Sequence, residues 1–280
     1  MIAAYCNRHT GRAQPWGAEV WYDAGVPHGH TDEFRGVVKH DSGAVMENRK
    51  GTTMNRVGWE LIWSSDQIPG RYGSFAAPND TVVEWADSLP AGASVFDLGC
   101  GIGRHAIYLG GRDFGMAGVD ISPTGVQRTA ALCAERGIAF DGRVCDMTTL
   151  PWPDAAFDAA LSTSTIHHGL RANIQRTIDE IWRLLKPGGL FLVDFPCTER
   201  ADYAFMRAEV AAGHLVEVEP NTFVDERPDS DDPDGFLPHH YCDEADVRDL
   251  LNRFTLERLW AELREGSRGK WVAWARKGAK

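Results

Sequence analysis

The stretch VFDLGCGIGRH, residues 95–105, decides the fold of this chain. A short apolar run ends in three glycines spaced Gly-x-Gly-x-Gly, and a helical pattern begins directly after them. Glycine lets the main chain turn sharply and lets a ligand approach it without a Cβ in the way. A helix N-terminus adds unpaired N–H donors. The stretch therefore predicts a buried strand, a ligand-binding turn and a helix.

Asp97, two residues before the first glycine, limits which ligand the turn can bind. In the dinucleotide fingerprint the glycines are spaced Gly-x-Gly-x-x-Gly, and the turn receives a pyrophosphate. Here the spacing differs, and Asp97 precedes the glycines. A carboxylate at this position repels pyrophosphate but suits an ammonium group. The turn therefore favours a nucleoside that carries an amino acid over a nicotinamide dinucleotide.

Outward from this turn, helical and strand patterns alternate, which is typical of a parallel α/β sheet. We predict a doubly wound, mostly parallel seven-stranded sheet with an antiparallel C-terminal edge strand. The last two strands, 255–263 and 270–276, are close enough to form a hairpin. The other elements that we predict are strands at 94–98, 116–121, 157–162 and 190–195, and helices at 79–89, 123–136, 173–185 and 243–253.

Four further motifs follow the glycine turn. Asp120 ends the second strand, where an acid can accept hydrogen bonds from both hydroxyls of a ribose. Asp146 stands in a loop where it can accept from an adenine amino group. The segments PWPDAAFD (151–158) and LKPGGLF (185–191) precede the next two strands. Within the first of them, Asp158 is interpreted as a structural residue.

As an ordered set, these five motifs resemble those of class I (Rossmann-like) S-adenosylmethionine (SAM) dependent methyltransferases, over about residues 58–276. The segments 103–109 and 118–123 resemble the small-molecule branch near the thiopurine and tellurite-resistance methyltransferases. The resemblance implies SAM as the cofactor and gives each position a role. Asp97 and the backbone of Gly99, Cys100, Gly101 and Gly103 would hold the methionine moiety, Asp120 the ribose, Ile121 the adenine face, Asp146 with Met147 the adenine edge, and Ser162 the methionine amine.

The acceptor should bind beyond the C-terminal strand ends, where open α/β sheets place their ligands. Two segments offer histidines there: TSTIHHG (163–169), and the insertion 196–242, which we expect to close over the site as a cap. His167, His168 and His240 are the candidate catalytic residues. For substrate contact the candidates are Trp63, Tyr72, His239 and Tyr241, with Arg71 as a further candidate for the cofactor carboxylate. Aromatic residues spaced like those near Trp63 are more often core packing than a ligand site, and the acidic run 229–234 is interpreted as a solvated loop tip rather than a trap for a cationic acceptor.

These features predict methyl transfer from SAM to a nitrogen, oxygen or sulfur atom of a small molecule. A SAM-fold catalyst of another reaction, such as cyclisation of SAM, and a non-catalytic SAM-binding protein remain alternatives. A general base is needed only if the acceptor loses its proton early. The histidine spacing matches no standard metal-ligand set, so we expect no metal.

Composition limits the partners and the location. The 280 residues carry a formal net charge of −11 and show no Lys/Arg cluster, so we expect no nucleic acid as partner. No apolar run reaches membrane-spanning length, and scattered cysteines suit a reduced cytoplasm. We expect a cytoplasmic monomer or homodimer. Residues 1–53 are predicted to be a loosely ordered arm, which an internal start at Met54 would remove, and 54–280 the methyltransferase domain.

Overall fold

The structure is a computed structural model that describes residues 20–22, 58–65, 77–199, 201–225, 227, 237–262 and 269–279. Tyr72, Arg71 and the acidic run 229–234 lie outside the described residues, as does most of the 1–53 segment.

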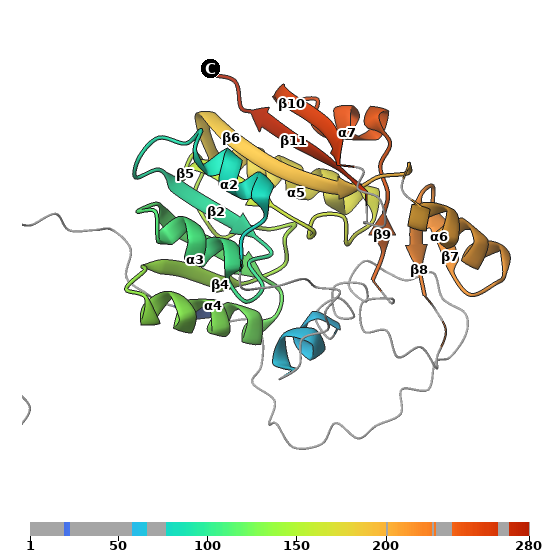
Figure 1. Cartoon of the computed structure of the whole chain (residues 1–280), viewed down its shortest axis with the longest axis horizontal. Coiled ribbons are helices and arrows are strands. Elements are labelled where there is room, and N and C mark those ends of the chain that lie inside the picture. Colours follow the sequence, from blue (N-terminus) through green and yellow to red (C-terminus); the bar gives the residue numbers. More distant parts are fainter. Residues whose placement is uncertain are drawn as a thin grey trace, which may run out of the picture.

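One eight-stranded sheet organises the molecule (Figure 1). In spatial order the strands are β1 (Val20–Tyr22), β4 (Phe140–Val144), β3 (Gly115–Asp120), β2 (Ser94–Leu98), β5 (Phe157–Ser162), β6 (Leu185–Pro196), β11 (Lys270–Arg276) and β10 (Thr255–Glu262). In this order each pair of neighbours from β1 to β6 is parallel, and β11 is antiparallel to both β6 and β10. The mostly parallel, doubly wound sheet is therefore confirmed, with the last strand of the chain, β11, next to the edge strand β10.

Three strands of the main sheet differ from the sequence prediction. The strand β4 was not among the strands named from the sequence, although seven were expected. Residues 1–53 were expected to hold no strand, yet β1 pairs in parallel with β4 as an eighth strand. Three residues are too few to show the alternation that identifies a strand in a sequence. This segment becomes a strand because it pairs with the open edge of β4. The strand β6 begins at Leu185 instead of Leu190, because the main chain around Gly188, with φ +81°, forms an irregularity within the pairing with β5.

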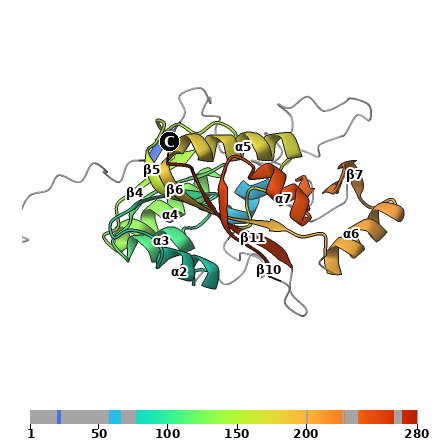
Figure 2. The ribbon, with the colours of Figure 1, turned by 90° about the horizontal axis from the view of Figure 1, so that it is seen from above.

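Helices cover both faces of the sheet (Figure 2). One face packs against α2 (Asp80–Ala86), α3 (Arg104–Gly110) and α4 (Pro123–Glu135), and the other against α5 (Arg171–Leu184) and α7 (Glu244–Leu250). The apolar residues of α5 follow a helical spacing, so that one side of the helix is buried. They are Ile174, Ile178, Ile181 and Leu184. Successive residues of each strand alternate between the two cores: in β6, Leu190 and Leu192 face one, and Phe191 and Val193 face the other.

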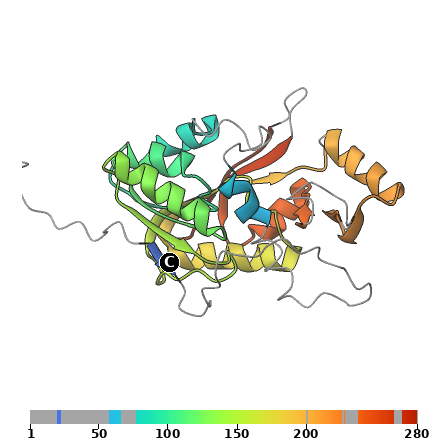
Figure 3. The same ribbon diagram turned by 90° about the horizontal axis from the view of Figure 1, so that it is seen from below.

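The insertion after β6 forms a small unit of its own, here called the insertion unit. It contains α6 (Ala201–Ala211) and a sheet ordered β7 (Val216–Glu219), β8 (Thr222–Val224), β9 (His239–His240). The unit lies beyond the end to which the parallel strands point, away from α2–α4 (Figure 3). Main-chain hydrogen bonds from His240 N to His167 O and from Cys242 N to Pro196 O join it to the main sheet region. The described residues include no helix long and apolar enough to cross a membrane.

Candidate functional site

The glycine turn after β2 requires glycine for two separate reasons. Gly99, Gly101 and Gly103 all have positive φ, at +74°, +51° and +88°. Other residues rarely adopt this region. A Cβ at Gly99 would also lie 2.3 Å from the Thr165 side chain, and one at Gly103 would lie 2.9 Å from the side chain of Thr129. The turn is therefore packed closely against the β5–α5 loop and against α4.

Main-chain amides of this turn are occupied within the protein. The amides of Gly99 and Cys100 donate to Val119 O, at 2.8 and 2.9 Å. The amide of Gly101 donates to Asp120 Oδ2 and that of Gly103 to Cys100 O, both at 2.9 Å. A phosphate is usually bound by several free amides at such a turn. With these four amides already engaged, the turn presents carbonyl and carboxylate oxygens, which suit a cation.

Asp97 places a buried carboxyl group at the end of β2, next to the turn. Its side chain is 2% exposed, and its Oδ2 has no hydrogen-bond partner among the described residues. Burial raises the pKa of Asp97 from its ordinary value of 3.8 to about 7, with Arg104 opposing the rise and Asp120 adding to it. A buried carboxylate without a partner is costly. An ammonium group placed against it would remove that cost.

Ser162 lies on the neighbouring strand at the same edge. Its fully buried hydroxyl also has no partner in the described part of the chain. In the pairing of β2 with β5, Asp97 is opposite Leu161, so Ser162 is one residue beyond that pair. Two adjacent strand ends thus each present an unsatisfied polar atom, at the edge where the predicted methionine moiety would bind.

The other predicted cofactor residues have structural bonds of their own. Asp120 is buried, and its Oδ1 accepts from Ser122 N at 2.9 Å; burial raises its pKa to about 6 despite the amide bonds. Asp146 Oδ1 accepts from the amide and the hydroxyl of Thr148, at 2.8 and 2.6 Å. Ile121, Asp146 and Met147 are half-buried, and Cys100 is buried. Whether these residues contact SAM stays a prediction.

A short helix at residues 58–64 lies over the turn, with Trp63 buried at its end. A Cβ added at Gly101 or Gly125 would lie 3.1 Å from the Trp63 ring. Glu60 of the same helix accepts from Ser122 Oγ at 2.5 Å and from Thr124 N at 3.2 Å, at the N-terminus of α4. The predicted substrate residue Trp63 therefore touches the cofactor turn itself.

Three of the predicted acceptor histidines form one cluster. The ring centroids of His167 and His168 are 4.0 Å apart, and His239 of the insertion unit lies 4.6 Å from His168. Trp59 of the 58–64 helix packs edge-on against His168 at 4.9 Å. Burial, and then the neighbouring His167 and His239, hold the pKa of His168 well below its usual range. Three segments that are distant in sequence thus enclose a neutral imidazole.

His240 and Tyr241 are placed differently from that cluster. His240 bonds to Thr222 across the β8–β9 pair, with 2.7 Å between Nδ1 and Oγ1. Tyr241 packs against Tyr203 and Phe223, at 5.4 and 5.6 Å between ring centroids. The Tyr241 ring therefore contributes to the aromatic core of the insertion unit.

Sequence reasoning missed a buried polar network behind Ser162. Asp194 Oδ1 accepts from Ser164 N at 2.6 Å, and its Oδ2 pairs with Lys270 Nζ at 2.8 Å. His105 is buried between Asn79 N and Thr163 Oγ1, and burial holds its pKa well below the usual range. Lys270 begins an antiparallel strand next to β6, so it reaches the edge where β6 ends. The network could not be found from the sequence because it depends on the pairing of β11 with β6, which brings Lys270 close to Asp194.

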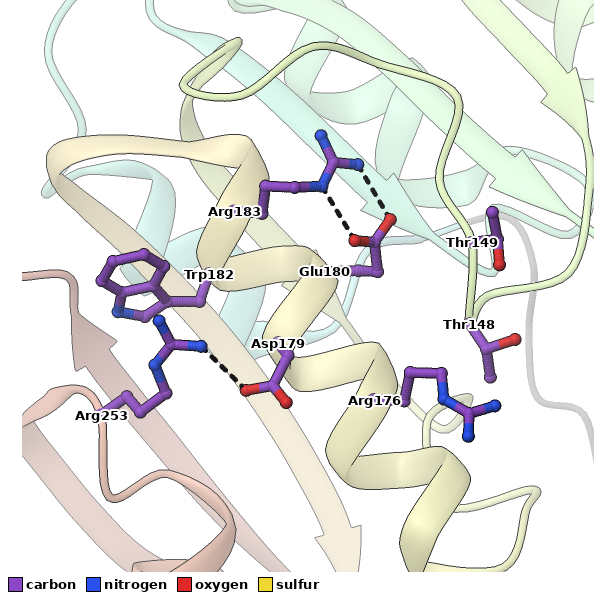
Figure 4. Close-up of a pocket in the computed structure, with 8 residues that line it drawn as sticks. All are labelled: Thr148, Thr149, Arg176, Asp179, Glu180, Trp182, Arg183 and Arg253. Carbon is purple, nitrogen blue, oxygen red and sulfur yellow. Dashed lines mark hydrogen bonds and ion pairs between the residues drawn. The ribbon is translucent and has the colours of Figure 1, made fainter.

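A surface hollow lies apart from these groups, on the outer side of α5 (Figure 4). It measures about 490 Å³ and lies between α5, Arg253 and the loop that contains Thr148 and Thr149. Two of its arginines are paired with acids: Arg183 with Glu180 at 2.8 Å, and Arg253 with Asp179 at 3.1 Å. The charges of this hollow are thus largely compensated. Among the described residues, no group of His, Cys, Asp and Glu is arranged to hold a metal ion.

With this geometry described, the chain can be compared with known proteins. Residues 96–193 match the family described as the methyltransferase domain. The tRNA (carboxymethyluridine(34)-5-O)-methyltransferase of Macaca fascicularis is 36% identical over 131 residues, which are 46% of this chain and 18% of that relative. A SAM-dependent Diels-Alderase of Talaromyces variabilis is 26% identical over 152 residues, 49% of this chain and 51% of that relative. The chain therefore spans only part of the length of these relatives.

A solved structure extends the comparison to most of the chain. The 1,6-didemethyltoxoflavin-N1-methyltransferase of Burkholderia thailandensis, with bound S-adenosylhomocysteine, has a TM-score of 0.63 and 19% identity. The likeness covers 85% of this chain and 93% of that protein, and at this identity it describes the fold alone.

Proposed function

Because the chain contains a class I SAM-dependent methyltransferase domain, we propose that it transfers a methyl group from SAM to a small-molecule acceptor. One observation supports SAM as the cofactor: the buried Oδ2 of Asp97, which has no partner among the described residues, lies beside a glycine turn in which four amides are occupied. The ammonium of the methionine moiety would donate hydrogen bonds to Asp97 Oδ2 and to Ser162 Oγ. The same turn offers little to a pyrophosphate.

Calorimetry tests this assignment. Titration with SAM, S-adenosylhomocysteine and NADH should show binding of the first two and none of the third. The Asp97→Asn variant, which keeps the shape and removes the charge, should bind both sulfur nucleosides at least tenfold more weakly, since a charge-assisted hydrogen bond contributes about 1.5–3 kcal/mol. Binding of NADH without binding of SAM would reject the proposal.

The acceptor would bind between the 58–64 helix, the His167–His168 segment and the insertion unit. Methyl transfer from a sulfonium is an in-line displacement, which an enzyme accelerates by alignment and by exclusion of water. Trp59 and His239, both half-buried, pack around the buried His168, and this cluster supports a site of this kind. An enclosed aromatic and neutral surface, in a chain with a net charge of −11, suits a small uncharged acceptor better than a polyanion.

A tRNA acceptor is the second candidate, and the name of the Macaca fascicularis relative favours it. Catalysis of a reaction other than methylation is the third, favoured by the name of the Talaromyces variabilis relative. Incubation with SAM labelled in the methyl group separates the three. Label in a low-mass extract fraction supports our proposal, label in tRNA supports the second candidate, and conversion of a substrate without release of S-adenosylhomocysteine supports the third.

A further inference from the structure

Two buried residues of the insertion unit face each other across a strand pair. Thr222 of β8 and His240 of β9 are direct neighbours, and Thr222 Oγ1 lies 2.7 Å from His240 Nδ1. Thr222 is fully buried and His240 is 1% exposed. A hydroxyl and a neutral imidazole can each donate or accept a hydrogen bond, so the direction of this bond follows from the other partner of Thr222.

Glu219 is that other partner. Its Oε1 lies 3.1 Å from Thr222 Oγ1 and also accepts from the amide of Arg171, at 2.5 Å, at the start of α5. An ionised carboxylate only accepts hydrogen bonds, whereas a hydroxyl has one proton to donate. The Thr222 proton is therefore directed at Glu219, and the Thr222 oxygen accepts. It follows that His240 carries its proton on Nδ1 and a lone pair on Nε2.

This lone pair has no partner in the described part of the chain. His240 Nε2 is buried and forms no hydrogen bond with any described residue. Burial lowers the pKa of His240, so the ring is neutral near pH 7; the charged groups that face it are Asp246 of α7, Glu219 of β7 and Arg171 of α5. A buried acceptor without a donor is unfavourable. Meanwhile the His240 amide donates to His167 O at 3.0 Å, which ties β9 to the segment that follows Ser162.

We infer that Glu219 and Thr222 are positioning residues, which hold His240 in the tautomer whose Nε2 takes the proton of the methyl acceptor. This inference rests on the proposed function. It also defines the acceptor class: a nucleophile that carries a proton, such as a hydroxyl. As the acceptor atom attacks, the bond between the methyl carbon and the sulfonium breaks and its electron pair stays on sulfur. The acceptor's proton moves to Nε2, and the charge of the resulting imidazolium is stabilised through Thr222 by Glu219.

The tautomer is measured directly on the full chain, without SAM or an acceptor. Long-range ¹H–¹⁵N correlation spectra distinguish protonated from unprotonated ring nitrogens, and His240→Gln assigns the resonances of His240. We expect Nδ1 protonated in the wild type and in Thr222→Ser, and a mixture of tautomers in Thr222→Val and Glu219→Ala. His239 is the internal control, because its Nδ1 lies 2.9 Å from the Leu237 carbonyl and does not depend on Glu219. A wild-type His240 protonated on Nε2 would overturn the inference.

The second arm tests the role of the lone pair. A panel of phenols, amines and thioethers is screened for release of S-adenosylhomocysteine by the wild type and by His240→Gln. Turnover of phenols should fall at least tenfold in the variant, with SAM affinity unchanged, whereas turnover of thioethers, which lose no proton, should not change. Phenol turnover that survives in His240→Gln would overturn the inference. If the wild type does not bind SAM, the proposed function is rejected, whichever tautomer His240 adopts.

Discussion

The Asp120 carboxylate accepts a hydrogen bond from the amide of Gly101, with 2.9 Å between Oδ2 and the nitrogen. Asp120 ends β3, whereas Gly101 lies in the turn after β2. The carboxylate thus holds the shape of the turn as well as standing where a ribose would bind. One residue therefore links the two strongest motifs of the sequence, and its substitution should affect both stability and binding.

Asp120→Ala should abolish measurable SAM affinity and also lower the free energy of unfolding. Two buried amides, those of Gly101 and Ser122, would lose their acceptor, at a cost of about 1–3 kcal/mol each. Calorimetry measures the first effect and urea unfolding the second. Affinity within twofold of the wild type would contradict the ribose assignment, and an unchanged midpoint of unfolding would contradict the structural role.

Gly99→Ala should destabilise the protein much more than Gly92→Ala. Both glycines have nearly the same φ, +74° and +71°, so both substitutions carry a left-handed penalty of about 1–2 kcal/mol. A Cβ at Gly92 meets nothing within 4 Å, whereas one at Gly99 would lie 2.3 Å from Thr165. Thermal unfolding of the matched pair isolates the effect of close packing. Equal losses would show that Thr165 can move aside without cost.

The stability of the cofactor-free protein should depend on Asp97 between about pH 4 and pH 7. In this window the folded protein keeps a proton on Asp97 that the unfolded chain has lost, because burial raises the pKa to about 7. The free energy of unfolding therefore decreases as the pH rises. Asp120, with a pKa of about 6, contributes with the same sign. Asp97→Asn removes the contribution of Asp97. The free energy of unfolding of the variant, measured with urea, should therefore increase relative to that of the wild type from pH 5 to pH 8. A constant difference would contradict the raised pKa.

Acceptor turnover should fall at least tenfold in one or more of His167→Ala, His168→Ala and His240→Ala. SAM affinity should change little, because these side chains lie beyond the glycine turn. His214→Ala is the control: this histidine of the insertion unit is exposed and its Nδ1 lies 3.0 Å from Glu209 Oε2, so turnover should stay within twofold. Steady-state kinetics with an identified acceptor measure these effects. Unchanged turnover and KM in all three histidine variants would place the acceptor elsewhere.

Deletion of residues 1–53 should leave a folded, SAM-binding protein with a lower melting temperature than a 1–18 deletion. The longer deletion removes β1 and exposes the edge of β4, whereas the shorter one keeps the pairing of Val20–Tyr22 with β4. Neither touches the residues around Asp97. Differential scanning fluorimetry with and without SAM compares the two truncations. Loss of cooperative melting in the longer one would show that β1 belongs to the folding core.

Periodicity and local chemistry predicted the main sheet well. The spacing of Ile174, Ile178 and Ile181 predicted a helix, and α5 buries these residues. The boundary near Gly188 was wrong because a run of proline and glycine is compatible with a turn and with an irregular strand alike. The strand β1 was missed for a related reason: three residues carry no period, and their pairing depends on the edge of β4.

The sequence by itself determined the glycine turn, the acids Asp97 and Asp120 at two strand ends, and the alternation of elements that makes the sheet parallel. These are local, since main-chain sterics and side-chain spacing act within a few residues. Only the tertiary structure decided that Asp120 accepts the Gly101 amide, that Lys270 reaches Asp194, and that Thr222 lies between Glu219 and His240. Burial and hydrogen bonding between distant segments depend on strand order and register, which no local pattern encodes.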